Sequence, residues 1–414
     1  MATVIRTGQT TLPVERVRRR YGGLDYGLIL VVGALLIVGL MMVYSTTFDW
    51  SYQEYHNSFH IASRQFLWVG LGAVVLVVVA RIPYDRWRQW ATPIMGVTLA
   101  SLVLVLLVGE RRFGAQRSFF NGSIQPGELA KLALVIYLAA WLSSKGEQIR
   151  NVTYGLVPFA VLIGVIAGLL VMQPDLSMAI LIVLTALAMF FFAGADIFQL
   201  TMGSAVVAIT FFALIKQIPY AQQRIDEYSQ IWRNPRLVSY HVQQALIALG
   251  SGGLFGTGLG QGQQKMGYLP VPHTDSIFAV LGEELGFFGC LVVITLFVLL
   301  AYRGFKIALN APDAFAALLA SGVTCWLTFQ AILNVAVLSG LLPFTGVALP
   351  FISSGGSPMV VSLAGIGLLL SVSRGRRSAK SIANRGHQVA NLDRRWGHRG
   401  TRLSGSGRRA GIDR

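Results

Sequence analysis

Ten apolar segments of roughly membrane-spanning length follow one another along the chain, and they constrain its fold more than any other feature. They cover residues 24–45, 62–80, 89–108, 128–144, 153–172, 175–194, 198–215, 276–301, 314–337 and 357–373. A helix needs about 20 apolar residues to cross the hydrocarbon core of a bilayer. Backbone polar groups in that core are satisfied only within helices or closed barrels. The sequence therefore predicts an all-α polytopic membrane protein with ten transmembrane helices.

Charge is scarce in these segments and concentrated at the ends of the chain. Charged residues make up 13% of the sequence, against about 25% in soluble domains. The net charge of +16 lies largely in the two tails. Residues 1–23 are predicted to be a basic cytoplasmic segment, residues 24–373 the membrane domain, and residues 374–414 a disordered basic cytoplasmic tail. Such tails set topology and contact anionic lipids, so membrane lipids, and no nucleic acid, are the expected partners of this charge.

The distribution of arginine and lysine between the loops predicts the orientation. Arginines before the first span place the N-terminus in the cytoplasm, and an even number of spans returns the C-terminus there. The predicted outside loops 46–61 and 338–356 contain no Lys or Arg, in agreement. The loop 109–127 departs from the trend, since it carries Arg111, Arg112 and Arg117. These cations either bind an anionic ligand or pair with nearby carboxylates or headgroups.

Residues 216–274 form a large predicted extracytoplasmic loop between spans 7 and 8. The stretch 220–236 is amphipathic and mixed in charge, which favours a position along the membrane interface, and 241–249 is typical of a short helix. Residues 250–262 contain seven glycines. This segment either brings backbone N–H groups to a phosphate or forms a tight re-entrant turn, and it lacks the lysine and serine of a P-loop.

The stretch 268–289 reads Y-L-P-V-P-H-T-D-S-I-F-A-V-L-G-E-E-L-G-F-F-G and concentrates the ionisable residues. Asp275 precedes an apolar run, where a helix N-cap is expected. Glu283 and Glu284 lie inside that run, and carboxylates within a membrane helix usually mark a functional cavity. On residue types alone, Asp275 is either a cap or a general base at the mouth of such a cavity.

Several sequence motifs, which follow one another along the chain in the same order as in a known family, carry a resemblance to that family. They are G-L-F-G-T-G-L-G-Q at 253–261, P-H-T-D-S-I-F-A-V-L-G-E-E-L-G at 272–286, Q-P-G-E-L-A-K at 125–131, Q-P-D-L at 173–176 and L-P-F-I-S-S-G-G-S at 349–357. With them, the chain from about residue 25 to 374 resembles the SEDS family of cell-wall polymerases (FtsW, RodA and SpoVE), and it looks most like FtsW.

The resemblance implies a function. Such proteins polymerise lipid II into β-1,4 glycan strands with inversion at the outer face of the bacterial cytoplasmic membrane. The implied substrates are lipid II and a glycan linked to undecaprenyl pyrophosphate, and the implied partner is a class B penicillin-binding protein with transpeptidase activity. A septal role is favoured over an elongation role. A lipid II flippase or transporter and a non-catalytic division scaffold are the alternatives.

The resemblance also implies the site residues. Asp275 would be catalytic. The predicted substrate-binding residues are Arg117, Glu128, Lys131, His273, Thr274, Glu283, Ser353, Gly355 and Gly356. A guanidinium such as that of Arg117 grips phosphate oxygens bidentately. Glu128 and Lys131 are spaced i, i+3 on a predicted helix and form either an internal salt bridge or part of a polar cavity.

Some positions depart from the family pattern, and the cofactor expectation rests on chemistry alone. Ser118 stands where the family commonly has Trp, Ser276 where it has Phe, Ser354 where it has Tyr and Pro358 where it has Ser. The sequence has no His and Cys metal motif and implies no organic cofactor. A pyrophosphate leaving group favours Mg²⁺ or Mn²⁺, so such a cation is expected with the substrate.

Overall fold

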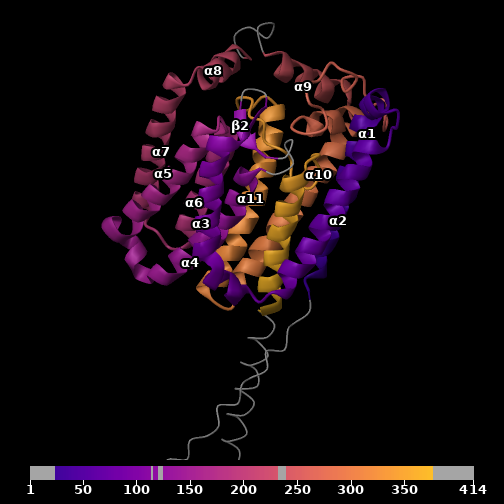
Figure 1. Ribbon diagram of the computed structural model, residues 1–414. Helices are drawn as coiled ribbons and strands as arrows, with labels where there is room; N and C mark the ends of the chain where they lie inside the picture. The colour runs from indigo at the N-terminus through magenta and orange to yellow at the C-terminus, as the bar shows by residue number, and fades with distance from the viewer. Residues whose placement is uncertain (1–23, 113–114, 120–124, 232–238, 376–414) are drawn as a thin grey trace, which may run out of the picture.

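The structure, a computed structural model, describes residues 24–112, 115–119, 125–231 and 239–375. Long helices lie side by side in one bundle, and short helices cover one end of it (Figure 1). Within the described residues, eight helices are long and apolar enough to cross a membrane, and two more apolar helices are shorter. The predicted segment 1–23 and nearly all of the predicted tail 374–414 lie outside the described residues.

The helices and strands follow one another with these bounds: α1 Tyr26–Tyr55, α2 His60–Arg81, α3 Tyr84–Val108, β1 Glu110–Arg112, β2 Ala115–Ser118, α4 Pro126–Lys145, the short 3₁₀ helix η1 Gly146–Arg150, the short π-helix η2 Val152–Leu156, α5 Val157–Met172, α6 Leu176–Phe192, α7 Ile197–Gln217, α8 Pro219–Ile231, α9 Tyr240–Ser251, α10 Ile277–Leu309 and α11 Ala314–Leu338. A last helix, which we call the C-terminal helix, covers Gly356–Gly375.

Each of the ten predicted spans coincides with a helix. The count of ten crossings stays a prediction, because α6 and the apolar part of α7 are the shorter helices. The all-helix expectation is modified between α3 and α4, where β1 and β2 form an antiparallel pair in which Arg112 lies opposite Ala115. This segment is polar and lies between two apolar helices, and pairing satisfies its backbone groups locally.

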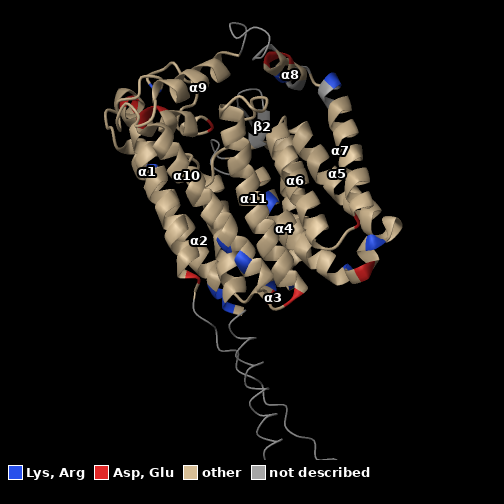
Figure 2. Ribbon diagram, turned by 180° about the vertical axis from the view of Figure 1, so that it is seen from behind, with Lys and Arg blue, Asp and Glu red and all other residues tan. Residues whose placement is uncertain are grey.

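Contacts between distant segments define the two ends of the bundle. Asp25 lies 3.7 Å from Arg303, Tyr84 donates a 2.9 Å hydrogen bond to Asp313, and the Arg374 guanidinium donates to the Ala80 carbonyl in the last turn of α2. We call this end the termini end, because the described chain begins and finishes there. The opposite end carries α8 and α9, and we call it the cavity end. Charged residues gather mainly at these two ends (Figure 2).

The centre of the bundle is formed by α11 and the C-terminal helix. Within their most apolar windows, 72% and 78% of residues are buried, against 17% in α2. The largest fully buried side chain is that of Trp326 on α11. Peripheral helices with exposed apolar side chains are expected where lipid, and not water, is the surrounding solvent.

Helix α1 continues ten residues beyond its predicted end, so most of the expected outside loop 46–61 is helical instead. Threonine hydroxyls at the start of this extension hydrogen-bond to carbonyls of the preceding turn. The Thr46 hydroxyl donates to the Met42 carbonyl at 2.8 Å, and the Thr47 hydroxyl donates to Val43 at 2.7 Å. The helix ends where His56 adopts a left-handed backbone conformation. Hydropathy missed the extension because its residues are not apolar.

Helix α10 is broken at Gly286, where φ is 68° and ψ is −166°. The backbone groups that the break releases pair with the glycine-rich segment 250–262. The bonds run from Thr257 N to Glu283 O (2.9 Å), Gly258 N to Glu284 O (3.0 Å), Phe287 N to Gly253 O (2.9 Å) and Phe288 N to Leu254 O (3.2 Å). Irregular backbone at membrane depth is tolerated when protein satisfies it in this way.

Glycine is required at this crossing because two backbones touch. A Cβ on Gly286 would collide with the backbone of Gly256, and a Cβ on Gly256 would collide with the carbonyl of Glu284. Both glycines also have positive φ, which disfavours any side chain. The segment 250–262 therefore fits the tight-turn interpretation, since its N–H groups at Thr257 and Gly258 already donate to α10.

Candidate functional site

A cavity of about 1280 Å³ opens at the cavity end of the bundle. Its wall comes from α1, α4, α6, α9 and α11, with the segments 265–275 and 344–358. Of the predicted site residues, these line it: Glu128, Lys131, His273, Thr274, Asp275, Gly355 and Gly356. Residues up to 228 positions apart in sequence thus meet at one site. Glu283 and Ser353 are not part of the wall, and the Arg117 side chain lies outside the described residues.

Asp275 is held at the wall by its backbone. The buried Asn334 amide on α11 donates to the Asp275 carbonyl at 2.9 Å and to the Val347 carbonyl at 2.7 Å. A Cβ built on Gly346 would lie 2.7 Å from Asp275 Oδ2, so the carboxylate packs against a residue without a side chain. Ser276 occupies the N-cap position of α10. Asp275, for which a capping role was considered, therefore lies one residue before the N-cap.

Ser353 connects the segment 349–354 to residues 273–274, which immediately precede Asp275. Its hydroxyl donates to the Thr274 carbonyl at 2.7 Å and accepts from the Leu349 N–H at 2.7 Å. The Ser354 N–H donates to the His273 carbonyl at 2.9 Å. The side chain of Ser353 is buried and shapes the backbone of the site. Direct substrate contact by Ser353 stays a prediction.

Two histidines line the cavity in the neutral form. Burial lowers the pKa of His273 to about 4, and its ring stacks on Trp50 with centroids 5.1 Å apart. Burial, and then the nearby positive charge of Arg224, lower the pKa of His241 to about 4. His241 Nε2 lies 2.6 Å from the Ser276 hydroxyl. At pH 7 these rings offer hydrogen bonds and stacking, and they add no positive charge to the cavity.

Glu128 and Lys131 form an internal salt bridge and are also part of the polar cavity, the two roles considered for them. Their side chains form a 2.7 Å ion pair and are almost fully buried, and both residues line the cavity. Lys131 Nζ also donates to Gln330 at 2.9 Å and lies 5.3 Å from the centre of the Trp326 ring. A buried charge is tolerated when it is paired and hydrogen-bonded. The pair therefore brings a compensated cation to the cavity wall.

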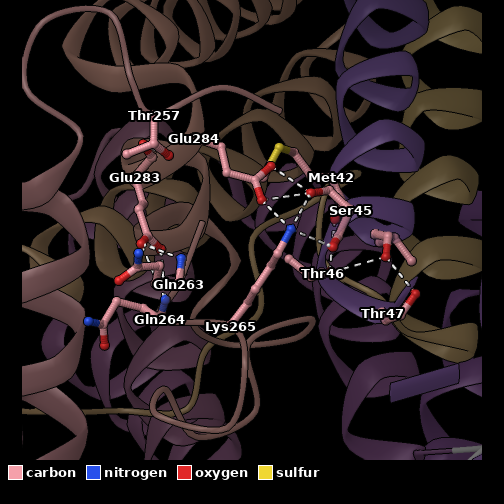
Figure 3. A network of polar contacts seen from close by, with 11 residues as sticks. Met42, Ser45, Thr46, Thr47, Thr257, Gln263, Gln264, Lys265, Glu283 and Glu284 are labelled. Atoms are coloured by element: carbon pink, nitrogen blue, oxygen red, sulfur yellow. Dashed lines mark hydrogen bonds and ion pairs between the residues drawn. The ribbon is translucent and has the colours of Figure 1, made fainter. Parts of the chain in front are cut away.

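A second buried ion pair joins the segment that carries Asp275 to two helices (Figure 3). Lys265 Nζ lies 2.6 Å from Glu284 Oε1 on α10. Ser45 on α1 donates to the same carboxylate at 2.7 Å, and its carbonyl accepts from Lys265 at 3.0 Å. The Lys265 and Glu284 side chains are 5% and 0% exposed, so this contact is shielded from water. It anchors the segment about ten residues before Asp275.

Glu283 also holds the segment that contains Lys265, by hydrogen bonds to its backbone. Its carboxylate accepts the backbone N–H groups of Gln263 at 2.7 Å and Gln264 at 3.2 Å (Figure 3). Glu283 is buried and turned toward this backbone. The structure thus gives the two carboxylates of the E-E pair separate structural partners, and a substrate-binding role for Glu283 stays a prediction.

Sequence reasoning did not select several cavity residues. Asp49 and Trp50 were assigned to a loop, and Lys265 and His241 received no role, although all four line the cavity. The available signal for Lys265 was that two intramembrane carboxylates followed it and required a cation. No local pattern identifies the positions of Trp50 or His241.

The fold and the cavity define a polytopic helical membrane protein with a polar site at one end of the bundle. Comparison with known families gives the particular class. The family model described as "Cell cycle protein" (FTSW_RODA_SPOVE) matches residues 26–378. The chain belongs to this FtsW/RodA/SpoVE family, which confirms the resemblance found in the motifs.

Individual relatives match over most of their length. The chain is 39% identical to "Stage V sporulation protein E" of Bacillus subtilis (strain 168), over 84% of this chain and 97% of that protein. It is 38% identical to "Probable peptidoglycan glycosyltransferase FtsW" of Trichlorobacter lovleyi, over 89% of this chain and 98% of that protein.

Two solved structures show the same fold. One, described as "Structural coordination of polymerization and crosslinking by a peptidoglycan synthase complex", has a TM-score of 0.71 and 30% identity. The other, the crystal structure of Thermus thermophilus rod shape determining protein RodA, has a TM-score of 0.64 and 31% identity. Each match covers 86% of this chain and 98% of the solved chain.

Proposed function

We propose that this chain is a peptidoglycan glycosyltransferase that polymerises lipid II into β-1,4 glycan strands. The observation that carries this proposal is the meeting of Asp275 with the Glu128–Lys131 ion pair in the wall of one large cavity. The name of the Trichlorobacter lovleyi relative supports the activity. The cavity is large enough for a saccharide substrate, since ligand pockets commonly span about 300–1,000 Å³.

The proposed reaction is a single displacement. The 4-hydroxyl of the GlcNAc of lipid II attacks the anomeric carbon of the MurNAc that ends the growing strand. Asp275 accepts the hydroxyl proton as the new C–O bond forms. The bond to undecaprenyl pyrophosphate breaks, and the pyrophosphate leaves with the bonding electrons. Attack from the opposite face inverts the anomeric centre and gives the β-1,4 linkage.

Cations that stabilise the leaving pyrophosphate would lower the barrier. We assign this role to Arg117, on the basis of the family resemblance and its position on β2. Its neighbour Ser118 is buried, so the strand packs onto the bundle beside α4. Lys131 is a second candidate, because its ammonium group lies at the cavity wall. Its ion pair with Glu128 reduces the net positive charge that it offers there.

A divalent cation would have to bind largely through the substrate. Among the described residues, no group of three or more His, Cys, Asp and Glu side chains is arranged to hold a metal ion. Mg²⁺ commonly uses one or two protein carboxylates together with substrate phosphates and water. We therefore propose Mg²⁺ or Mn²⁺ only as a companion of the pyrophosphate, and we assign it no protein ligand.

We propose ten crossings, with the cavity facing the outside of the bacterial cytoplasmic membrane. Described basic residues at the termini end support this orientation; they are Arg81, Arg86, Arg88, Lys145, Arg150, Arg303 and Lys306. Loops rich in Lys and Arg remain in the cytoplasm. We expect a reporter fused after Arg374 to be cytoplasmic and one inserted near Gln222 in α8 to be outside. Finding both reporters on the same side would refute ten crossings.

We propose a class B penicillin-binding protein as partner, and a septal role over an elongation role. The solved structure described as a peptidoglycan synthase complex supports coupling of polymerisation to crosslinking. The described part of this chain is a membrane bundle with a short hairpin, and we assign crosslinking to the second protein. The FtsW name of the Trichlorobacter lovleyi relative supports the septal role.

Purified protein incubated with lipid II and its partner, without a membrane gradient, tests the proposed activity. We expect a ladder of glycan products, because the reaction needs only the two lipid-linked substrates and the cavity. Absence of polymer together with lipid II movement across vesicle membranes would favour a flippase. Absence of both activities, with Asp275→Ala still functional in cells, would favour a scaffold.

A further inference from the structure

The extension of α1 beyond its apolar part reaches the cavity. Asp49, Trp50 and Gln53 line the cavity, whereas Tyr52 and Glu54 on the same extension do not. Asp49 and Gln53 are spaced i, i+4, so their side chains share one face of the helix. The extension therefore presents a carboxylate, an indole and a carboxamide together on the cavity side.

Trp50 is fixed on one side and open on another. Its ring stacks on His273 with centroids 5.1 Å apart and planes inclined by 28°. The residue is nevertheless 47% exposed. The backbone of His273 is itself tied by the Ser354 N–H at 2.9 Å. The indole is thus held in place while part of its surface remains available to a ligand.

The three side chains match the chemistry of a sugar ring. A pyranose has a face of C–H groups, which packs on an aromatic surface, and a rim of hydroxyl and amide groups. A carboxylate accepts hydrogen bonds from hydroxyls, and a carboxamide both donates and accepts. An apolar wall with a few placed polar groups is the usual composition of a ligand site.

The negative charge of this patch disfavours binding of the pyrophosphate part of the substrate here. Asp49 contributes a negative charge, and the neighbouring His273 is neutral near pH 7 because burial lowers its pKa to about 4. Like charges within a few ångströms repel. The phosphate groups are therefore expected elsewhere in the cavity, and the uncharged sugar portion suits this wall.

We propose that Asp49, Trp50 and Gln53 form a saccharide subsite, in which an N-acetylated sugar ring of the lipid-linked substrate stacks on Trp50. This inference rests on the proposed polymerase function. The subsite holds a sugar and takes no part in proton transfer, which is assigned to Asp275. It places the end of α1 among the elements that determine which substrate is bound.

Steady-state polymerisation of lipid II by the purified protein with its partner tests the subsite. We expect Trp50→Ala to raise KM for lipid II about tenfold, the effect of losing one good aromatic stack. The value of kcat should stay within about twofold, because uniform binding affects KM and not the chemical step. Trp50→Phe should recover most of the affinity, since an aromatic face remains. Tyr52→Ala is the matched control, because Tyr52 lies on the same helix and does not line the cavity.

The outcomes separate this inference from the proposed function. If the wild-type protein forms no glycan, the proposed function fails first. If the wild type polymerises and Trp50→Ala has the KM of Tyr52→Ala, the subsite is refuted. Gln53→Ala decides the matter if Trp50→Ala does not fold, as judged by its thermal melting. An unchanged KM in a folded Gln53→Ala would then overturn the proposal, and a severalfold increase would support it.

Discussion

Replacing Asp275 by Asn is expected to lower the rate of glycan formation by about 10²–10⁴-fold, the usual effect of losing a general acid or base. The amide keeps the size of the carboxylate and cannot accept the hydroxyl proton. The backbone anchor from Asn334 to the Asp275 carbonyl does not involve the carboxylate and should persist. The measurement is the initial rate of polymer formed from lipid II by the purified variant with its partner.

A lower rate reports on the chemical step only if the Asp275→Asn variant keeps its stability and its binding to the partner. We expect the thermal melting of Asp275→Asn and its binding to the partner to match the wild type. Asp226→Asn provides a control, because it makes the same carboxylate-to-amide change at an exposed position on α8. A well-folded Asp275→Asn with near-normal polymer formation would exclude Asp275 as the general base.

Replacing Lys265 by Met is expected to destabilise the protein by about 3–5 kcal/mol, because it leaves a buried carboxylate without its cation. Lys265 and Glu284 are 5% and 0% exposed, and among the described residues Ser45 would remain as the hydrogen-bond partner of the carboxylate. Activity should fall as well, since the pair anchors the segment that leads to Asp275. Thermal melting and denaturant unfolding in detergent measure the loss of stability.

A second substitution separates the lost interaction from the uncompensated charge. The double variant Lys265→Met with Glu284→Gln should regain part of the stability, because neither charge is then buried alone. Lys306→Met is the matched control at an exposed position near the end of α10, where a small effect is expected. If Lys265→Met melts at the wild-type temperature, the buried pair does not hold this segment.

The local prediction of the Glu128–Lys131 contact succeeded for a physical reason. Residues spaced i, i+3 on a helix are neighbours whatever the rest of the fold does, and their ion pair is 2.7 Å long in the structure. The Lys265–Glu284 pair was missed because its partners lie on a loop and on a broken helix. No periodic pattern links such positions, and their meeting depends on how the glycine-rich segment folds against α10.

The sequence by itself determined that the chain forms membrane-length helices, because a bilayer leaves a long apolar segment no other way to satisfy its backbone. It also determined the family, through motifs that retain their order. Only the tertiary structure decided where α1 ends, that α10 is broken at Gly286, and that Trp50 and His241 share a cavity with Asp275. These features depend on contacts between residues that are far apart in the chain. Hydropathy averages over neighbours in sequence and therefore does not report such contacts.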